Sequence, residues 1–140
     1  MVISGDGFSG TTFYFNTANS SGYYDTSFHQ TSLSLVEDTD SINLQIHFHF
    51  SGETYFAAQD TLPGLNNVSD TILIANKSSQ KFNIYRPLYI NDFLTITSFD
   101  NAGGHINGVF SGFYINNSNY KDTLKVSNGR FSIIRLPDVY

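Results

Sequence analysis

Apolar and polar residues alternate with a period of two along much of this sequence, most clearly over residues 42–50. Every second position in that stretch is apolar: Ile42, Leu44, Ile46, Phe48 and Phe50. Such alternation is typical of a β-strand with one face buried. The longest stretches without turn residues follow this period rather than the 3.6-residue period of a helix, so the pattern predicts an all-β protein.

A hairpin is expected to join residues 42–50 to the alternating stretch before them, residues 31–35 (TSLSL). The polar run at residues 37–40 supplies the turn. With Leu35 opposite Ile42, the apolar faces of the two strands coincide, which is the requirement that sets the register of a half-buried sheet.

A second hairpin is predicted at Asn128-Gly129. This dipeptide suits a two-residue type I′ turn, because both central residues of that turn need positive φ. Centring the turn there places Val126 opposite Phe131, and the two apolar side chains then share one face.

A third hairpin is predicted around residues 100–104 (DNAGG), between strands at 93–99 and 105–115. The second of these strands contains Gly108 and Gly112, which we expect at bulges or at close approaches of two backbones. Weaker patterns predict further strands at residues 11–15, 54–58, 71–75 and 81–85. Pro87 is expected to end the last of these, since it cannot donate a ladder hydrogen bond.

These elements predict a single all-β domain over residues 1–140, an antiparallel β-sandwich or flattened barrel of about nine to ten strands with hairpin connections. Hairpin order alone does not distinguish the sandwich from the barrel. Residues 1–10 are expected to form a flexible lead-in. The predicted core consists of Leu33, Leu35, Ile42, Leu44, Ile46, Phe48, Leu94, Ile96, Phe110, Leu124, Val126, Phe131 and Ile133.

Composition supports the β prediction and excludes several classes of protein. Aromatic residues make up 16% of the 140 residues, and Ser, Thr, Asn and Gln about a third. Charged residues are only 14%, against roughly 25% in an average domain. A formal net charge of −5 disfavours nucleic-acid binding, and the absence of Cys excludes disulfide scaffolds and Cys-ligated zinc modules.

Two locations fit the sequence. No apolar run reaches the roughly 18–20 residues of a membrane span, and residues 1–10 lack the basic and apolar regions of a signal peptide. The protein is therefore cytosolic, or Met1 stands where a signal or lipid anchor has been removed. The Ser/Thr/Asn-rich surface with few Lys and Glu favours export, to the periplasm, the outer-membrane surface or the extracellular space.

Three segments of the C-terminal half share a pattern with a known group of proteins: FLTITSFD at residues 93–100, HINGVFSG at 105–112 and LKVSNGRF at 124–131. The pattern resembles that of small uncharacterised lipoprotein-type β-domains of Bacteroidota, in which TIT..D, I.G.FSG and NG.F recur in this order. The resemblance implies an exported envelope domain that follows a signal peptide and a lipidated Cys. It implies no enzymatic activity, because the function of that family is unknown.

Two clusters of side chains are candidate metal sites. His47 and His49 lie two residues apart, so both imidazoles point to one face of a strand, which suits metal binding. In the expected register they lie opposite Gln30 and Phe28, neither of which is a good ligand, so a polar strand face is favoured. The acidic residues at 37–40 lack the glycine and the spacing of a calcium loop. No metal or cofactor is therefore predicted.

The sequence also predicts a protein without catalytic activity. Only two Glu are present, and the ten Asp mostly stand at predicted turns, where they bond their own backbone. There is no Cys nucleophile and no Gly-x-Ser-x-Gly motif. The triplet Gly5-Asp6-Gly7 lacks the strand-to-helix turn of a phosphate-binding loop.

Exposed tyrosines are the remaining candidates for binding. Tyr23 and Tyr24, with Tyr85, Tyr89 and Tyr120, could stack on a sugar ring while nearby Asn and Asp bond its hydroxyls. Tyrosines on half-exposed strands explain the same residues without a ligand.

Three functions follow from these observations. The first is a non-catalytic envelope or surface domain that contacts another protein, for example as an accessory subunit, and it predicts an exposed apolar patch or a bare sheet edge without a pocket. The second is a carbohydrate-binding module, with two or more Tyr on one exposed face. The third is a carrier of a small apolar ligand, which requires an unfilled barrel interior.

Overall fold

A computed structural model describes residues 1–15, 17–51, 57–59, 69–88 and 93–140 of the chain. All regular structure within these residues is β, which confirms the all-β prediction. Their strands are slightly more numerous than expected: β1 (Val2–Gly5), β2 (Phe8–Thr12), β3 (Ser21–Asp25), β4 (Gln30–Asp38), β5 (Ile42–Ser51), β6 (Ala57–Gln59), β7 (Ser69–Asn76), β8 (Lys81–Pro87), β9 (Phe93–Phe99), β10 (His105–Asn116) and β11 (Thr123–Arg135).

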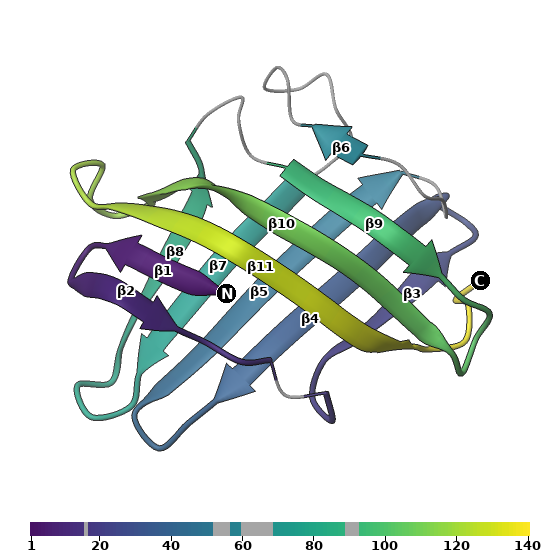
Figure 1. The fold of residues 1–140 in the computed structure, drawn as a ribbon, viewed down its shortest axis with the longest axis horizontal. Helices are drawn as coiled ribbons and strands as arrows, with labels where there is room; N and C mark the ends of the chain where they lie inside the picture. The colour runs from purple at the N-terminus through teal and green to yellow at the C-terminus, as the bar shows by residue number, and fades with distance from the viewer. Residues whose placement is uncertain (16, 52–56, 60–68, 89–92) are drawn as a thin grey trace.

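The strands form one hydrogen-bonded sheet that closes on itself as a flattened barrel (Figure 1). The closed ring runs through β3, β4, β5, β7, β8, β10 and β11, and back to β3. β1 and β2 extend the sheet beyond β11, and β9 and β6 extend it beyond β10. The choice between sandwich and barrel is therefore made by the short pairings that close this ring.

One strand pair is parallel, although the sequence predicted antiparallel pairs. β3 and β11 run in the same direction, with Ser21 beside Ile134 and Gly22 beside Arg135. The two strands come from opposite ends of the chain, so no short turn forces them to run in opposite directions. The other named pairings of the described strands are antiparallel.

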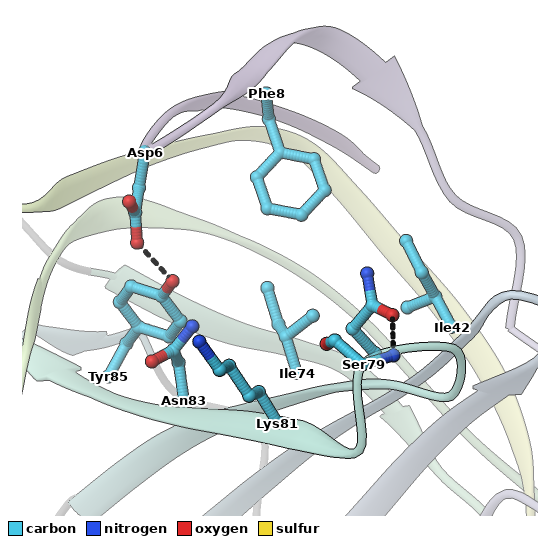
Figure 2. Close-up of a pocket in the computed structure, with 9 residues that line it drawn as sticks. Asp6, Phe8, Ile42, Ile74, Ser79, Lys81, Asn83 and Tyr85 are labelled. Atoms are coloured by element: carbon cyan, nitrogen blue, oxygen red, sulfur yellow. Dashed lines mark hydrogen bonds between the residues drawn. The ribbon is translucent and has the colours of Figure 1, made fainter.

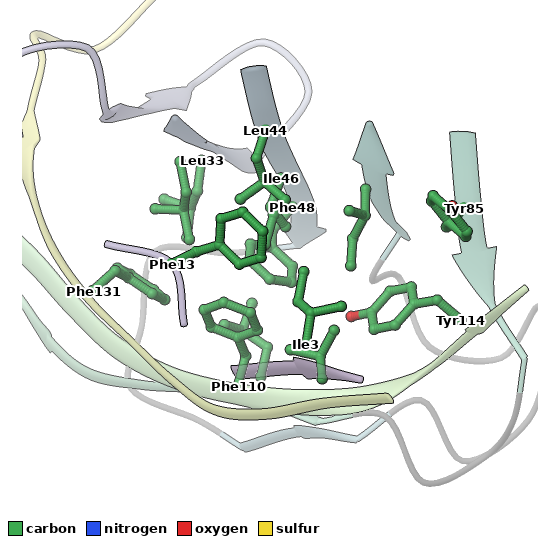
Figure 3. Packing of buried hydrophobic residues seen from close by; sticks show 14 of the residues in the cluster. Ile3, Phe13, Leu33, Leu44, Ile46, Phe48, Tyr85, Phe110, Tyr114 and Phe131 are labelled. Atoms are coloured by element: carbon green, nitrogen blue, oxygen red, sulfur yellow. The ribbon is translucent and has the colours of Figure 1, made fainter. Parts of the chain in front are cut away.

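The core lies between β4, β5 and β7 on one side and β9, β10 and β11, which cross over them, on the other (Figures 1 and 3). At its centre the Phe110 ring lies 5.2 Å from that of Phe48 and 6.2 Å from that of Phe131, measured between centroids. Such pairs add about 0.5–1.5 kcal/mol each to the energy of area burial. All the residues predicted for the core belong to this cluster, with Ile42 at its partly buried margin.

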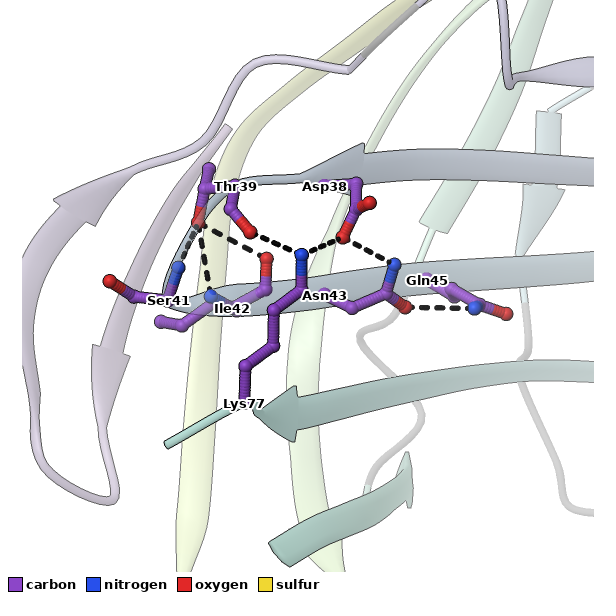
Figure 4. A network of polar contacts seen from close by, with 7 residues as sticks. All are labelled: Asp38, Thr39, Ser41, Ile42, Asn43, Gln45 and Lys77. Carbon is purple, nitrogen blue, oxygen red and sulfur yellow. Dashed lines mark hydrogen bonds and ion pairs between the residues drawn. The ribbon is translucent and has the colours of Figure 1, made fainter. Parts of the chain in front are cut away.

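The predicted hairpin of residues 31–50 is confirmed as β4 and β5, with a different register. Leu35 pairs with Ile46 rather than Ile42. The turn is centred two residues later than expected, between the paired residues Asp38 and Asn43. There the Thr39 hydroxyl accepts hydrogen bonds from the backbone N–H groups of Ser41 and Ile42 (Figure 4). A shift of four residues is even, so the same side chains still face the core.

The hairpin predicted at Asn128-Gly129 is wrong, because β11 continues through this dipeptide without reversing its direction. Asn128 has a positive φ of 53°, whereas Gly129 is not among the residues with positive φ, and a type I′ turn needs both. One left-handed residue makes a bulge instead. The pairing with β10 shifts there, from Phe110 opposite Gly129 to Gly112 opposite Val126.

The hairpin predicted between residues 93–99 and 105–115 is confirmed as β9 and β10. Both glycines of β10 stand where they were expected. The register with β9 shifts between Asn107 and Gly108, and the register with β11 shifts just before Gly112. Gly108 also permits a close approach, since a Cβ there would lie 2.4 Å from Cζ of Phe131.

The weaker strand predictions have mixed outcomes. β7 and β8 confirm those at residues 71–75 and 81–85, and β8 ends at Pro87. The strand predicted at residues 11–15 lies earlier, because β2 ends at Thr12. The strand predicted at 54–58 falls largely outside the described residues, although β6 overlaps its end.

The expectation that residues 1–10 form a flexible lead-in is wrong. These residues contain β1 and most of β2, and β1 pairs with β11. Ile3 is fully buried in the core. The short strands escaped prediction because Ile3 is the single core residue of β1, which leaves no alternation to detect.

Gly108→Ala should destabilise the fold. A methyl group at this position meets both the Phe131 ring and, at 2.8 Å, the carbonyl oxygen of Thr95. Overpacking of this kind costs about 1–3 kcal/mol in free energy of unfolding, measured by urea denaturation. His105→Ala, at an exposed position of the same strand, is the control, with an expected change within about 0.5 kcal/mol. Equal stability of the two variants would contradict the close packing described for Gly108.

Candidate functional site

The inner faces of β5, β7 and β8 change from apolar to polar toward the end of the barrel where the β7–β8 hairpin turns. The register sets three successive layers across these strands: Ile46, Ile72 and Tyr85, then Leu44, Ile74 and Asn83, then Ile42, Asn76 and Lys81. Because side chains alternate along a strand, Lys81 and Asn83 share a face with the buried Tyr85. Polar groups thus occupy positions that continue the core.

The turn between β1 and β2 covers this end of the barrel. Gly5, Asp6 and Gly7 have positive φ values of 90°, 44° and 85°. Glycine is required at the first position, because a Cβ on Gly5 would lie 2.3 Å from the carbonyl oxygen of Thr123. The turn carries Asp6 over β8, where the hydroxyl of Tyr85 donates a hydrogen bond to the Asp6 carboxylate (Figure 2).

A cavity of about 250 Å³ lies between this turn and the β7–β8 hairpin. Figure 2 shows the Phe8 ring on one side of it and the side chains of Lys81, Asn83 and Tyr85 side by side on the other. Phe8 is held in place by an edge-to-face contact with Phe13, with ring centroids 5.8 Å apart. The cavity, called the end pocket below, therefore has an aromatic wall facing a polar one.

The end pocket is lined by one acidic and one basic side chain, Asp6 and Lys81. Burial, followed by the hydrogen bond to Asp6, raises the pKa of Tyr85 above its usual range. Tyr85 thus remains a protonated donor at neutral pH and holds the Asp6 carboxylate in place. The ion pairs found among the described residues lie elsewhere and do not engage Lys81. The pocket thus offers donors and acceptors with no net charge.

The orientation of β8 is opposite to the one its hydrophobicity favours. Phe82 faces outward and is 63% exposed, while its neighbours Lys81 and Asn83 line the end pocket. Turning β8 over would bury Phe82, but it would also remove Tyr85 from the core, where it is 1% exposed. Departures from local preference of this kind concentrate at functional sites.

The structure does not bring Tyr23 and Tyr24 together as a sugar-binding platform. They are consecutive in β3 and point to opposite faces, and Tyr24 is buried with its hydroxyl 3.0 Å from Nδ1 of His29. Tyr85 is buried as well, whereas Tyr120 is exposed. Tyr89 lies outside the described residues.

His47 and His49 share the outer face of β5, as expected. The register places Ser34 and Ser32 opposite them, rather than Gln30 and Phe28. The Ser32 hydroxyl and Nδ1 of His49 are 2.9 Å apart. No group of three or more His, Cys, Asp or Glu that could hold a metal occurs within the described part of the chain.

The acidic turn after β4 forms an ion pair and a hydrogen bond with Lys77 of the β7–β8 hairpin (Figure 4). The Lys77 ammonium lies 2.8 Å from Oδ1 of Asp38 and 2.5 Å from the carbonyl oxygen of Thr39. Asn43 donates a further hydrogen bond to the Asp38 carboxylate, at 3.0 Å. The hydrogen bond from Lys77 lowers the pKa of Asp38. These contacts link the ends of two hairpins.

A second cavity, of about 360 Å³, lies between residues 13–15 and the middle of β11. Its buried polar side chain, Ser20, already bonds the backbone of Val36, with its hydroxyl oxygen accepting from the N–H at 2.8 Å. That group serves the packing of β4, so the end pocket is the better candidate for a ligand.

The end pocket depends on residues that sequence reasoning did not single out, namely Asp6, Phe8, Lys81 and Asn83. The Gly5-Asp6-Gly7 triplet marks a turn in the sequence, but only the tertiary structure places that turn against β8. No protein-family model, curated protein or solved structure matches the chain. The described residues also contain no helix that could cross a membrane.

His47→Gln should flatten the pH dependence of stability. Burial, and secondarily the charge of His49, lowers the pKa of His47 from 6.5. The unfolded chain then binds a proton at a higher pH than the folded protein does, so protonation favours unfolding. The free energy of unfolding should be constant above pH 6.5 as far as this group is concerned, and should fall as the pH drops below 6.5. Denaturation of the wild type and of His49→Gln across this range supplies the comparison. An unchanged slope in His47→Gln would contradict the assignment.

Proposed function

We propose that this protein is a non-catalytic binding domain of the cell envelope or cell surface, and that it holds a small polar ligand in the end pocket. The observation that supports this most directly is the orientation of β8, which turns Lys81 and Asn83 into the pocket while Phe82 faces outward. The burial of Tyr85 sets this orientation, and two polar side chains lie beside the cavity as a result.

The chemistry of the end pocket supports binding rather than catalysis. Its carboxylate, Asp6, accepts a hydrogen bond from Tyr85, and the raised pKa of Tyr85 makes that phenol a poor proton donor or acceptor near neutral pH. A carrier with an enclosed apolar ligand receives less support, because aromatic side chains fill the described interior of the barrel (Figure 3).

Composition supports the envelope location in this proposal. Only 14% of the residues are charged, and the C-terminal pattern resembles lipoprotein-type domains. The exposed rim of the end pocket is built from Asn76, Ser79, Lys81 and Asn83, which suits a ligand that arrives from solvent.

Binding at the end pocket can be tested with a library of small polar molecules, although the natural ligand is unidentified. Amide NMR spectra of the labelled protein, recorded with a library of small polyols, amides and carboxylates, should show shifts confined to Asp6, Phe8, Ile74 and Asn83. Asn83→Trp should abolish them by filling the pocket, whereas Phe82→Trp, on the outer face of the same strand, should not. Shifts confined to other surfaces, or none with any fragment, would overturn the proposal.

A second candidate function is contact with another envelope protein through the edge of the sheet. Among the described strands, β2 is at the end of the strand order and pairs with β1 alone, and its residues Ser9 to Thr12 are exposed. An unpaired strand edge can accept a strand from a partner.

Edge pairing predicts that a charge on β2 weakens capture of the partner. Thr11→Lys should reduce the amount of envelope protein retained by the immobilised chain, because Lys on an edge strand opposes strand addition. Ser27→Lys, at an exposed position outside the strands, is the matched control. Equal retention by the two variants would exclude β2 as the contact.

A further inference from the structure

We propose that the end pocket binds one uncharged sugar residue, with the Phe8 ring against its apolar face and the groups of Asp6, Lys81 and Asn83 bonding its hydroxyls. This inference rests on the proposed binding function and adds the chemical class of the ligand. It follows from three properties of the pocket: its apolar wall, its mixture of hydrogen-bonding groups and its size.

The apolar side of the end pocket suits a sugar ring. Phe8 is half-buried and its position is set by the edge-to-face contact with Phe13, while Ile42 and Ile74 line the cavity beside it. A pyranose has one face made of C–H groups, which packs on an aromatic or aliphatic surface. A rigid ring of this kind is an anchor that costs little conformational entropy when a ligand binds.

The polar side of the pocket offers both donors and acceptors. Asn83 and Ser79 can each donate and accept, the ammonium of Lys81 donates, and the carboxylate of Asp6 accepts. Each sugar hydroxyl is both a donor and an acceptor, so it can bridge groups of either kind. A ligand with a net negative charge, such as a phosphate, would lie unfavourably close to the Asp6 carboxylate.

The charge of the pocket selects an uncharged ligand. Asp6 and Lys81 cancel in formal charge, and the hydrogen bond from Tyr85 stabilises the carboxylate without neutralising it. A ligand with a net charge would meet attraction from one of these side chains and repulsion from the other. Uncharged hydroxyl groups satisfy both of them.

The size of the pocket limits the ligand to one residue. Its volume of about 250 Å³ is below the range of roughly 300–1,000 Å³ for cavities that enclose a drug-sized molecule. Asn76, Ser79, Lys81 and Asn83 are all exposed around it, so the pocket is open to solvent. A terminal sugar of a longer glycan can therefore enter while the rest of the chain stays outside.

The test is an NMR titration of the intact protein with the methyl glycosides of glucose, galactose and mannose, beside methyl glucuronide and glycine. At least one neutral glycoside should give saturable shifts at Phe8 and Asn83. Asn83→Ala, at the exposed rim, should weaken its binding about tenfold or more, and Phe8→Ala should do the same if it folds. Phe82→Ala is the matched control and should leave the affinity unchanged.

The outcomes separate this inference from the proposed function. Binding of glucuronide or glycine alone, or glycoside binding that Asn83→Ala leaves unchanged, overturns the sugar assignment. If no glycoside binds while polar fragments still shift the pocket residues, the sugar assignment fails and the binding function stands. If neither glycosides nor fragments reach the pocket, both proposals fail.

Discussion

The pairing of β11 with β10 on one side, and with β1 and β3 on the other, is the constraint on which the other features depend. β11 bonds β10 along most of its length, and its far edge is shared between β1 and β3. The bulge at Asn128 bends the strand so that it can reach both neighbours, since a bulge increases local twist. The pairing at Ile134 and Arg135 closes the sheet, and backbone hydrogen bonds from Leu136 to Gly22 and from Val139 to Tyr24 continue the contact with β3.

Closure of the sheet also explains the position of the end pocket. Because β1 pairs with β11, the turn at Gly5–Gly7 lies over the ends of β7 and β8. Phe8 then meets Phe13 on one side, and Asp6 meets Tyr85 on the other. The end pocket lies between the β1–β2 turn, whose position depends on β11, and the strands β5, β7 and β8, whose register sets the residues on its other side.

The orientation of β8 links stability to the proposed function. Tyr85 is a large core residue whose hydroxyl is hydrogen-bonded to Asp6. Because side chains alternate along a strand, its burial determines which face each of the remaining side chains of β8 occupies. Lys81 and Asn83 face the pocket as a consequence, and exposure of Phe82 is the cost. The same hydrogen bond that satisfies Tyr85 orients the acidic group of the pocket.

Local pattern in the sequence determined the long strands with clear alternation, such as β4 and β5, and which of their faces is buried. Leu33, Leu35, Leu44 and Ile46 could be assigned to the core because alternation is a property of a single strand. The β9–β10 turn and the role of Gly108 were also accessible, since turn and bulge chemistry is local. The tertiary structure alone decided the rest. Asn128-Gly129 favours a hairpin turn in isolation, and only the pairing with β10 turns it into a bulge. The end pocket was likewise beyond prediction, because Asp6 and Tyr85 are 79 residues apart in sequence and no local preference encodes which distant strands become neighbours.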